Sequence, residues 1–454
     1  MSSVSFADKI KLLDNNDEAL QARAALVANA KHDIYIEYFE FGNDDFSLTS
    51  LALLREAALR GVKVKILMDS MHNALTNAQL AAFLGVAENS KSLENIEIRL
   101  FNPLRSLNLY HQTYRNHDKL LNVDGEYMIV GGRNAAEAYF GKSKRMNFKD
   151  ADALVTGQSA QDSKEYFLKL WNTNPEVKKL ELYKYSQWQI SAPNCNNEQS
   201  EVCFAPEREI LSHRARITAL YDQFNAGKAW IKAQPLADIL ADIEDVSEIK
   251  FAYNDPSREM KKVELKLADQ IMESIVANAQ KSITITTPYL YPTDKELTSL
   301  QVLASRGVKI KIITNSLAST DTPLVHAALL TIEKQLADMG VELYLFKGPE
   351  VLHAKTAIID DKVAFIGSFN FDRRSANLNR EIGIQVGNMK DIKVSAFTQE
   401  LIQFIDSELV ANSVLAIKDG KEMDLEAFDA LVPEKKREDL ERAKKYVGLI
   451  KESI

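Results

Sequence analysis

The sequence predicts an α/β protein that consists of two similar halves. Two observations lead to this fold class: blocks of sequence occur twice in the same order, and strand-like apolar runs alternate with a helical stretch in each copy. The segment RGVKVKILMDS at 60–70 recurs as RGVKIKIITNS at 306–316. The other repeated blocks are 31–39 with 280–290, 95–101 with 340–346, and 117–134 with 353–370. Alternating strands and helices favour a layered sheet in each half.

Each copy is expected to contain a strand, a helix, two further strands and a hairpin, in that order. The runs IYIEYF and VKVKILM of the first copy are rich in β-branched residues, which is typical of strands. Between them, SLALLREAALRG has helical periodicity and ends at Gly61, a good C-cap residue. In the second copy TDKELTSLQVLASRG takes the same place and ends at Gly307.

The repeats divide the chain into four expected segments. These are an N-terminal half, a mostly helical connection that carries most of the unrepeated sequence, a C-terminal half and a charged helical tail, at 1–160, 161–275, 276–410 and 411–454. The tail sequence EKKREDLERAKKYVGLIKES predicts an amphipathic helix, for which a solvated face is favoured over a membrane anchor.

The composition is ordinary for a globular protein with a large core, since 46% of the 454 residues are hydrophobic and 26% are charged. The net charge of -8 excludes a surface that binds polyanions everywhere, and no basic cluster flanks the motifs described below. Nucleic acid is therefore not an expected partner. The sequence has no apolar run of about 18 residues and no signal-peptide pattern, so neither a transmembrane segment nor a signal peptide is expected.

The two cysteines, Cys195 and Cys203, lie close together in the polar stretch APNCNNEQSEVCFAP. They could form a small disulfide in an oxidising compartment, or remain two unpaired thiols in a surface loop, and the sequence leaves both alternatives open. No histidine or further cysteine stands at ligand spacing, so no metal site is expected.

A histidine and a lysine stand two positions apart in each copy: His117 with Lys119, and His353 with Lys355. Each pair begins an apolar run that is expected to be a strand. Because strand side chains alternate between faces, both members of a pair should point to one side, and Asp118 should point away. A lone histidine at a strand start is usually structural, whereas its repetition together with the lysine favours a function.

Each pair is followed by a tight hairpin, at Asp124-Gly125 and at Asp360-Asp361. Turn chemistry alone explains an aspartate at such a place, yet both aspartates belong to the repeated motif and are therefore candidate catalytic residues. Small residues and an amide follow at matching positions, namely Gly131-Gly132 with Asn134, and Gly367-Ser368 with Asn370.

These residues meet the needs of phosphodiester cleavage without a metal. The two lysines supply fixed cations for an anion that gains charge when it is attacked. The two histidines can divide the work, one as nucleophile and the other as general acid. Supporting roles are expected for the remaining candidates: Asn134, Asn370, Gly132 and Ser368 line the phosphate pocket, and Asp150 and Glu381 accept a hydrogen bond from the histidines.

The pattern His-x-Lys-x4-Asp, present twice with a downstream Gly-Gly or Gly-Ser and an Asn, resembles the phospholipase D superfamily. The resemblance covers about residues 30–160 and 280–410. It implies two α/β sandwich halves with pseudo-twofold symmetry and one shared active site. It also implies a phosphohistidine intermediate and no requirement for a metal or another cofactor.

A closer likeness is to the bacterial cardiolipin synthase C branch, whose members transfer phosphatidyl groups between phospholipids. It extends beyond both motifs to TNSLASTDTPLVHAALL. By this likeness, five residues border the pocket of the second motif: Thr314, Asn315, Ser316, Asp321 and His326. A plain strand end and loop is the alternative. Asp118 departs from the branch, which tends to have an amide after its first histidine.

The resemblance implies a phosphatidyltransferase or phosphodiesterase of phospholipid metabolism, with phosphatidylglycerol or phosphatidylethanolamine as substrate. We expect His117 to be the nucleophile and His353 the acid. We also expect a bacterial cell-envelope protein in peripheral contact with the membrane, and the sequence leaves open whether a partner protein assists. Three alternatives are a nuclease of the same superfamily, a purely hydrolytic phospholipase D, and a degenerate scaffold that only binds phosphorylated partners.

Overall fold

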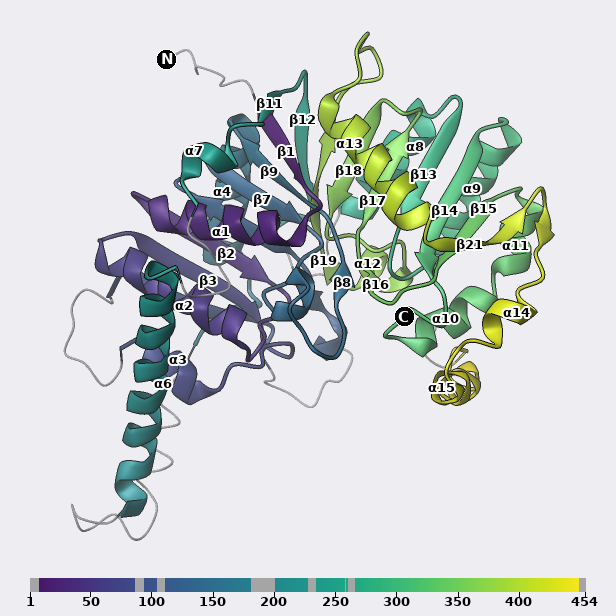
Figure 1. The fold of residues 1–454 in the computed structure, drawn as a ribbon. Coiled ribbons are helices and arrows are strands. Elements are labelled where there is room, and N and C mark those ends of the chain that lie inside the picture. Colours follow the sequence, from purple (N-terminus) through teal and green to yellow (C-terminus); the bar gives the residue numbers. More distant parts are fainter. Residues whose placement is uncertain are drawn as a thin grey trace.

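The computed structural model describes residues 8–85, 94–103, 111–180, 201–227, 234–257, 259 and 266–448. Within these ranges the chain forms two mixed sheets of nine strands each, which lie side by side with helices packed against them (Figure 1). The predicted fold class, two similar α/β halves, is confirmed.

The first sheet has its repeated strands at the centre. Its order is β10 (Val177–Lys179), β4 (Ile96–Phe101), β3 (Lys63–Asp69), β2 (Asp33–Tyr38), β6 (Lys119–Val123), β7 (Tyr127–Gly131), β9 (Asp152–Thr156), β1 (Lys9–Leu13) and β11 (Glu244–Asp245). The outer face is covered by α1 (Asn16–Asn29), α2 (Asp45–Leu59) and α3 (Asn77–Phe83). The long helix α6 (Glu201–Asn225) buries Ile217 and Phe224 in the same core and projects from the body (Figure 1).

The second sheet repeats this arrangement. Its order is β12 (Ile249–Tyr253), β20 (Ile382–Val386), β18 (Val363–Gly367), β17 (Thr356–Ile359), β13 (Ser282–Thr286), β14 (Lys309–Asn315), β15 (Glu342–Phe346), β21 (Ser413–Lys418) and β22 (Lys421–Glu422). Its outer helices are α8 (Leu267–Asn278), α9 (Asp294–Ser305), α10 (Pro323–Leu330), α11 (Glu333–Asp338) and α15 (Glu434–Lys444). Helices α2 and α9 end before Gly61 and Gly307 as predicted, because both glycines adopt the left-handed conformation.

A third core lies between the halves and is built from the inner faces of both sheets. Helices α4 (Gln158–Thr173) and α13 (Ala396–Phe404) contribute to it, with Trp171 and Phe397 among its largest buried side chains. This shared apolar core fixes the two halves against each other, so residues from both can meet at one site.

Two short ladders connect the halves next to the repeated motifs. Strand β5 (Arg115–Asn116) runs parallel to β19 (Asn379–Arg380), and β8 (Phe148–Lys149) runs parallel to β16 (Val351–Leu352). Each ladder joins the residues just before a motif histidine to the residues just before a carboxylate of the other half. The ladders therefore decide which carboxylate meets which histidine.

The sheets extend past the expected segment boundaries. Strands β10 and β11 of the segment 161–275 belong to the first sheet, and β12 belongs to the second. Strand β21 of the expected tail pairs with β15. The outermost strand of a sheet has unpaired backbone N–H and C=O groups, with which a further strand can pair. The strands added in this way lie outside the repeated blocks, so the repeat did not predict them.

In the part of the chain that is described, we find no helix that combines the length and the apolar character needed to cross a bilayer. The side chains of Cys195 and Cys203 lie outside the described residues, so both alternatives for these thiols stay predictions.

Candidate active site

The two motifs come together through hydrogen bonds that cross between the halves. Nδ1 of His117 lies 2.9 Å from Oε1 and 3.0 Å from Oε2 of Glu381, which belongs to the second half. Nδ1 of His353 lies 2.6 Å from Oδ2 of Asp150, which belongs to the first half. All four side chains are buried. Asp150 and Glu381 thus accept hydrogen bonds from the histidines as predicted, and each carboxylate serves the motif of the opposite half.

The crossed pairing follows from the short ladders. The backbone N–H of His117 donates to the carbonyl of Arg380 at 3.0 Å, directly before Glu381. The backbone N–H of His353 donates in the same way to the carbonyl of Lys149 at 2.7 Å. Since a carboxylate holds each Nδ1, that nitrogen carries the proton and Nε2 is the ring atom left for chemistry.

The two lysines point to the same side as their histidines. Nζ of Lys119 donates to the carbonyl of His117 at 2.6 Å, and Nζ of Lys355 lies 2.9 Å from Nδ1 of His353. Both lysines are buried, and the charge of Lys355 lowers the pKa of Lys119 by repulsion. The two cations therefore occupy one shared site, as an anionic substrate requires.

Burial dominates the electrostatics of the site. Loss of water lowers the pKa of Lys119 to about 7 and that of Lys355 to about 8, although nearby carboxylates raise both. Burial and the two lysines lower the pKa of His117 well below its usual value. Burial and Lys355 lower the pKa of His353 to about 4, with Asp150 acting in the opposite direction.

The two carboxylates differ in charge. Burial alone would raise the pKa of Asp150, but His353 and Lys355 bring it below the usual value, so this group is ionised. Burial raises the pKa of Glu381 well above the usual value, against the attraction of Lys119. His353 is therefore paired with an ionised carboxylate, and His117 with a carboxyl group whose ionisation is disfavoured.

Gly132 and Ser368 lie against these carboxylates, not free in a pocket wall. A Cβ at Gly132 would stand 2.1 Å from Oδ1 of Asp150, so only glycine leaves room for that side chain. The hydroxyl of Ser368 donates to Oε2 of Glu381 at 2.5 Å. These two residues fit the carboxylates that orient the histidines.

The two asparagines are used differently. Nδ2 of Asn134 donates to the hydroxyl of Tyr139 at 2.8 Å, and its Oδ1 accepts from the backbone of Glu40 at 3.3 Å. Oδ1 of Asn370 is buried and has no hydrogen-bond partner among the described residues. Asn370 is thus the better placed of the two to contact a ligand, and Asn134 fixes the wall of the site.

Asp124 and Asp360 do not reach the site. Each follows the far end of its motif strand, β6 or β17, and has a positive φ in the turn, of 58° and 51°. Five residues of strand span roughly 16 Å, which separates these carboxylates from the lysines. Asp124 accepts from the backbone of 31–33, and Asp360 accepts from the backbone of 280–282. A catalytic role for both was predicted, and the structure gives them a structural one instead.

The segment TNSLASTD holds the backbone that directly precedes the second motif. Asn315, at the end of β14, accepts from the backbone N–H of Leu352 at 2.9 Å and donates to its carbonyl at 2.8 Å. Asp69 at the end of β3 holds the backbone N–H of Asn116 in the same way, at 3.1 Å. The repeat could have revealed Asp69, because it aligns with Asn315.

The other members of this segment divide between the site and its surroundings. Asp321 accepts from the hydroxyl of Tyr289 at 3.0 Å and raises the pKa of Lys355. The hydroxyl of Thr314 donates to the carbonyl of Pro288, and that of Ser316 lies 3.5 Å from Ser319. His326 lines a cleft between α10 and α15 and contacts the backbone of Asn315, so its place at the border of the second motif stays a prediction.

Aromatic rings surround the histidines, and no sequence pattern predicted their place. The rings of Tyr139 and Phe148 lie 5.2 and 4.9 Å from that of His353, and Phe39 lies 4.8 Å from His117. The ring of the exposed His72 lies 4.1 Å from that of Phe39, tilted by 33°. These rings exclude water from the histidines and so explain part of their low pKa.

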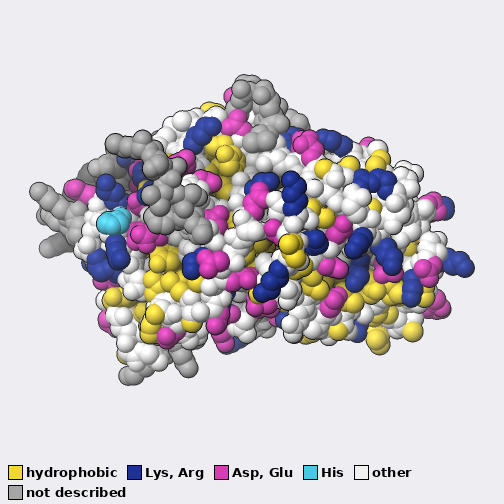
Figure 2. Space-filling model, turned by 90° about the horizontal axis from the view of Figure 1, so that it is seen from above, with side chains coloured by type: hydrophobic (Ala, Val, Ile, Leu, Met, Phe, Trp, Pro, Cys, Tyr) yellow, Lys and Arg dark blue, Asp and Glu magenta, His cyan; other side chains and the backbone are white. Residues whose placement is uncertain are grey.

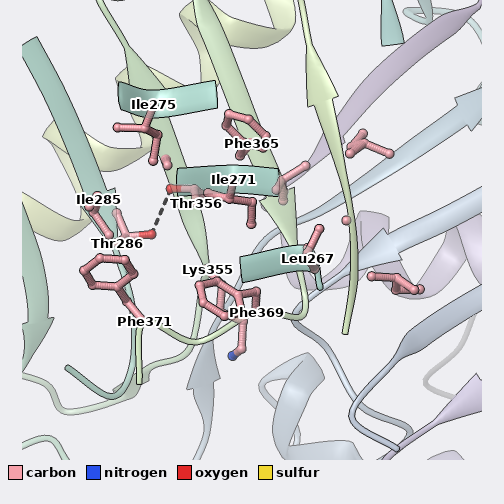
Figure 3. A pocket seen from close by; sticks show the side chains of 16 residues that line it. Leu267, Ile271, Ile275, Ile285, Thr286, Lys355, Thr356, Phe365, Phe369 and Phe371 are labelled. Atoms are coloured by element: carbon pink, nitrogen blue, oxygen red, sulfur yellow. Dashed lines mark hydrogen bonds between the residues drawn. The ribbon is translucent and has the colours of Figure 1, made fainter. Parts of the chain in front are cut away.

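A small apolar cavity of about 40 Å³ lies behind Lys355, between α8 and the second sheet. Ile271, Phe365 and Phe369 line it, and the amine of Lys355 points away from it (Figure 3). The hydroxyls of Thr286 and Thr356 hydrogen-bond to each other at its edge, at 2.8 Å. The aliphatic part of the lysine is thus held by apolar contacts, and its charge is directed to the carboxylates.

Fold and site together define a duplicated phospholipase D-like protein, in which one His-Lys motif from each half faces a common centre. The family model described as cardiolipin synthase, phospholipase D-like domain, matches residues 24–171 and 272–407. The chain belongs to this family.

Curated relatives are bacterial. Cardiolipin synthase C of Escherichia coli K12 is 29% identical over 410 residues, which are 82% of this chain and 80% of the relative. Cardiolipin synthase 1 of Bacillus anthracis is 28% identical over 82% of this chain and 62% of its own length. Among solved structures, phosphatidylserine synthase of Haemophilus influenzae matches 99% of this chain and 97% of its own, with a TM-score of 0.66 and 15% identity. That structural likeness concerns the fold.

Proposed function

We propose that the protein is an enzyme that transfers phosphatidyl groups between phospholipids, in the manner of a cardiolipin synthase. The observation that carries the proposal is the pair of crossed histidine–carboxylate contacts, with two lysines between them. Membership of the cardiolipin synthase family and the names of the relatives support the substrate class.

The first step joins the phosphatidyl group to a histidine. Nε2 of His117 forms a bond to phosphorus, and the phosphorus–oxygen bond to the headgroup alcohol breaks. His353 gives its proton to the departing oxygen. In the second step the hydroxyl of another lipid gives its proton to His353, its oxygen bonds to phosphorus, and the phosphorus–nitrogen bond breaks. Lys119 and Lys355 stabilise the charge that develops on the phosphoryl oxygens.

The two carboxylates support this division of roles. The anion of Asp150, 2.6 Å from Nδ1, raises the pKa of His353 against the larger effect of burial, so this ring accepts and passes on a proton more readily than it would without Asp150, as an acid must. Ionisation of Glu381 is disfavoured, so this group stabilises the imidazolium form of His117 less than Asp150 stabilises that of His353. This difference suits His117 as the nucleophile, because a nucleophile must be neutral. The residues that carry out these steps are His117 and His353, and neither step requires a metal.

Peripheral contact with a membrane is part of the proposal, because the substrate is an amphiphile that resides in a bilayer. Met71, next to His72 beyond the end of β3, is a large apolar side chain that is 59% exposed. We expect phosphatidylglycerol or phosphatidylethanolamine as the lipid. Sedimentation with vesicles of these lipids tests the contact: the protein should pellet with them, and Met71→Asp should weaken the association.

A nuclease of the same superfamily would use the same chemistry on another phosphodiester. It would need a basic groove for the phosphate backbone. Over the face drawn in Figure 2, acidic and basic side chains are interspersed, in keeping with the net charge of -8. No observation favours this alternative, and hydrolysis of the lipid differs only in that water resolves the intermediate.

One experiment tests substrate and nucleophile together. The protein is mixed with phosphatidylglycerol or phosphatidylethanolamine in detergent micelles, with and without EDTA, and quenched within seconds for peptide mass spectrometry. We expect a phosphatidyl adduct on His117, a transfer product, and no effect of EDTA. Absence of both transfer and hydrolysis products with either lipid would contradict the proposal, and loss of activity with EDTA would contradict its metal independence.

A further inference from the structure

Two carboxyl groups, Glu37 and Asp118, are buried directly beneath the first motif, and the chemistry described above does not use them. Neither residue has exposed surface. Asp118 stands between His117 and Lys119 and points away from them, as the strand pattern predicted. Glu37 lies on β2 opposite Leu120, whose side chain belongs to the core between the sheets.

Each carboxyl group has one oxygen with a neutral donor and one without. Nδ2 of Asn116 donates to Oε1 of Glu37 at 2.8 Å, and the hydroxyl of Tyr166 donates to Oδ2 of Asp118 at 2.5 Å. Oε2 of Glu37 and Oδ1 of Asp118 are buried and have no hydrogen-bond partner among the described residues. The two groups act on each other through their charges: ionised Asp118 raises the pKa of Glu37, which favours a state in which one of the two keeps a proton.

The charged and polar neighbours decide which group keeps the proton. Burial raises the pKa of both carboxyl groups, and the charge of Asp118 raises that of Glu37 further. Tyr166 from α4, Arg380 from β19 and Lys119 from β6 all lower the pKa of Asp118. The pKa of Glu37 is raised the more strongly, so Glu37 keeps a proton more readily and Asp118 ionises more readily.

The second half has no such charge at the corresponding positions. By the repeat, Thr286 takes the place of Glu37 and Ala354 the place of Asp118. Neither threonine nor alanine can ionise, and the hydroxyl of Thr286 forms a hydrogen bond with that of Thr356. Lys355 has other acidic neighbours beyond the two shared carboxylates, Asp321 and Asp372. Lys119 thus has an additional acidic neighbour, Asp118, which lies in the protein interior on the other face of the same chain segment.

We propose that the Glu37–Asp118 pair is a built-in buried anion that keeps Lys119 as an ammonium at neutral pH, ready to bind the phosphate group of the substrate. Asp118 acts through Lys119 and is therefore a positioning residue. The inference rests on the proposed function only in assuming that the site binds a phosphate group.

Burial and nearby carboxyl groups act on the charge of Lys119 in opposite directions. Lys119 is 1% exposed, and this burial lowers its pKa to about 7 even though Glu381 and Asp118 raise it. A unit charge several ångströms away in a protein interior shifts a pKa by about one unit or more. Without Asp118, Lys119 would be mostly neutral at pH 7 and would attract an anion poorly.

The test compares two variants that differ only in this charge, Glu37→Gln and Glu37→Gln with Asp118→Asn. Binding of inorganic phosphate is measured by calorimetry between pH 6 and 9. Glu37→Gln should follow the wild-type profile, because Glu37 is already neutral. The double variant should lose phosphate affinity at a pH about one unit lower, which is about tenfold weaker binding on the alkaline side.

Two outcomes overturn the inference: a double variant with the profile of Glu37→Gln, or a shift already present in Glu37→Gln. Absence of phosphate binding by the wild type at every pH overturns it as well. Because the readout is binding and not turnover, a protein that binds phosphate with this pH dependence but acts on no lipid contradicts the proposed function and leaves the inference standing.

A second variant covers the case in which the double variant does not fold, which circular dichroism would show. Tyr166→Phe keeps both carboxyl groups and removes only the hydroxyl that donates to Asp118. The pKa of Asp118 should rise, and the phosphate profile should move to lower pH by less than in the double variant. An unchanged profile contradicts the proposal.

Discussion

The two halves present almost the same catalytic side chains and support them with different ones. Behind His353, a short carboxylate, Asp150, fits against a glycine, Gly132. Behind His117, a longer carboxylate, Glu381, receives a serine hydroxyl, from Ser368. The His-x-Lys motif is therefore the same in both halves, whereas the residues that contact its histidines differ, and that difference can give two chemically identical histidines different roles.

Replacement of the histidines should have the largest effect on activity and tests whether the two rings have different roles. His117→Ala and His353→Ala should each lower the rate of phosphatidyl transfer by at least about 10³-fold, because nucleophile and acid are lost. The two variants should differ with a p-nitrophenyl phosphodiester, whose leaving group needs no proton. His353→Ala should then still form the covalent adduct, and His117→Ala should not. The reverse pattern, seen by mass spectrometry, would exchange the assigned roles.

Replacement of the carboxylates should have the next largest effect. Asp150→Asn removes the anion beside His353 and should lower kcat by about 10³-fold, because His353 is then protonated even less readily and loses the support for its tautomer. Glu381→Gln removes a carboxyl group that resists ionisation and should cost about 10²-fold. Steady-state kinetics in micelles measures both. Equal losses would mean that the two histidines are supported equally.

The pH dependence separates the two lysines. With pKa values of about 7 for Lys119 and about 8 for Lys355, kcat/KM should fall as the pH rises through this range, because each ammonium is lost in turn. Their effect on stability has the opposite sign. The unfolded chain binds more protons at these lysines up to about pH 10.4, so their contribution to the free energy of unfolding increases between pH 7 and 10. A flat kcat/KM profile to pH 9 would contradict the low values.

Exchange of the small residues should have a smaller and unequal effect. Gly132→Ser places a side chain against Asp150 and should lower the free energy of unfolding by about 2 kcal/mol, together with activity. Ser368→Gly removes one hydrogen bond to Glu381 and should cost about 1 kcal/mol. Urea unfolding measures both values. A harmless Gly132→Ser would show that the first half does not depend on the close fit.

The turn aspartates give the smallest effect and the test of their structural role. Asp124→Asn and Asp360→Asn keep the left-handed turn and weaken the contacts with the neighbouring backbone, so each should lower the free energy of unfolding by about 1 kcal/mol. The value of kcat should change less than twofold in both halves. A large loss of kcat without loss of stability would return these residues to the catalytic machinery.

The sequence by itself determined what depends on local order along the chain. The repeat gave two α/β halves, strand alternation placed His117 and Lys119 on one side and Asp118 on the other, and the hairpins follow from Asp-Gly and Asp-Asp. These features need only neighbouring residues, whose spacing is written in the sequence.

Only the tertiary structure decided which groups meet across the halves. Glu381 lies 264 positions from His117, and Asp150 lies 203 positions from His353. No periodicity carries such a pairing, because two short parallel ladders and a shared core create it. The same holds for the raised pKa values of Glu37 and Asp118, since burial between two packed sheets is what disfavours the charge of a carboxyl group.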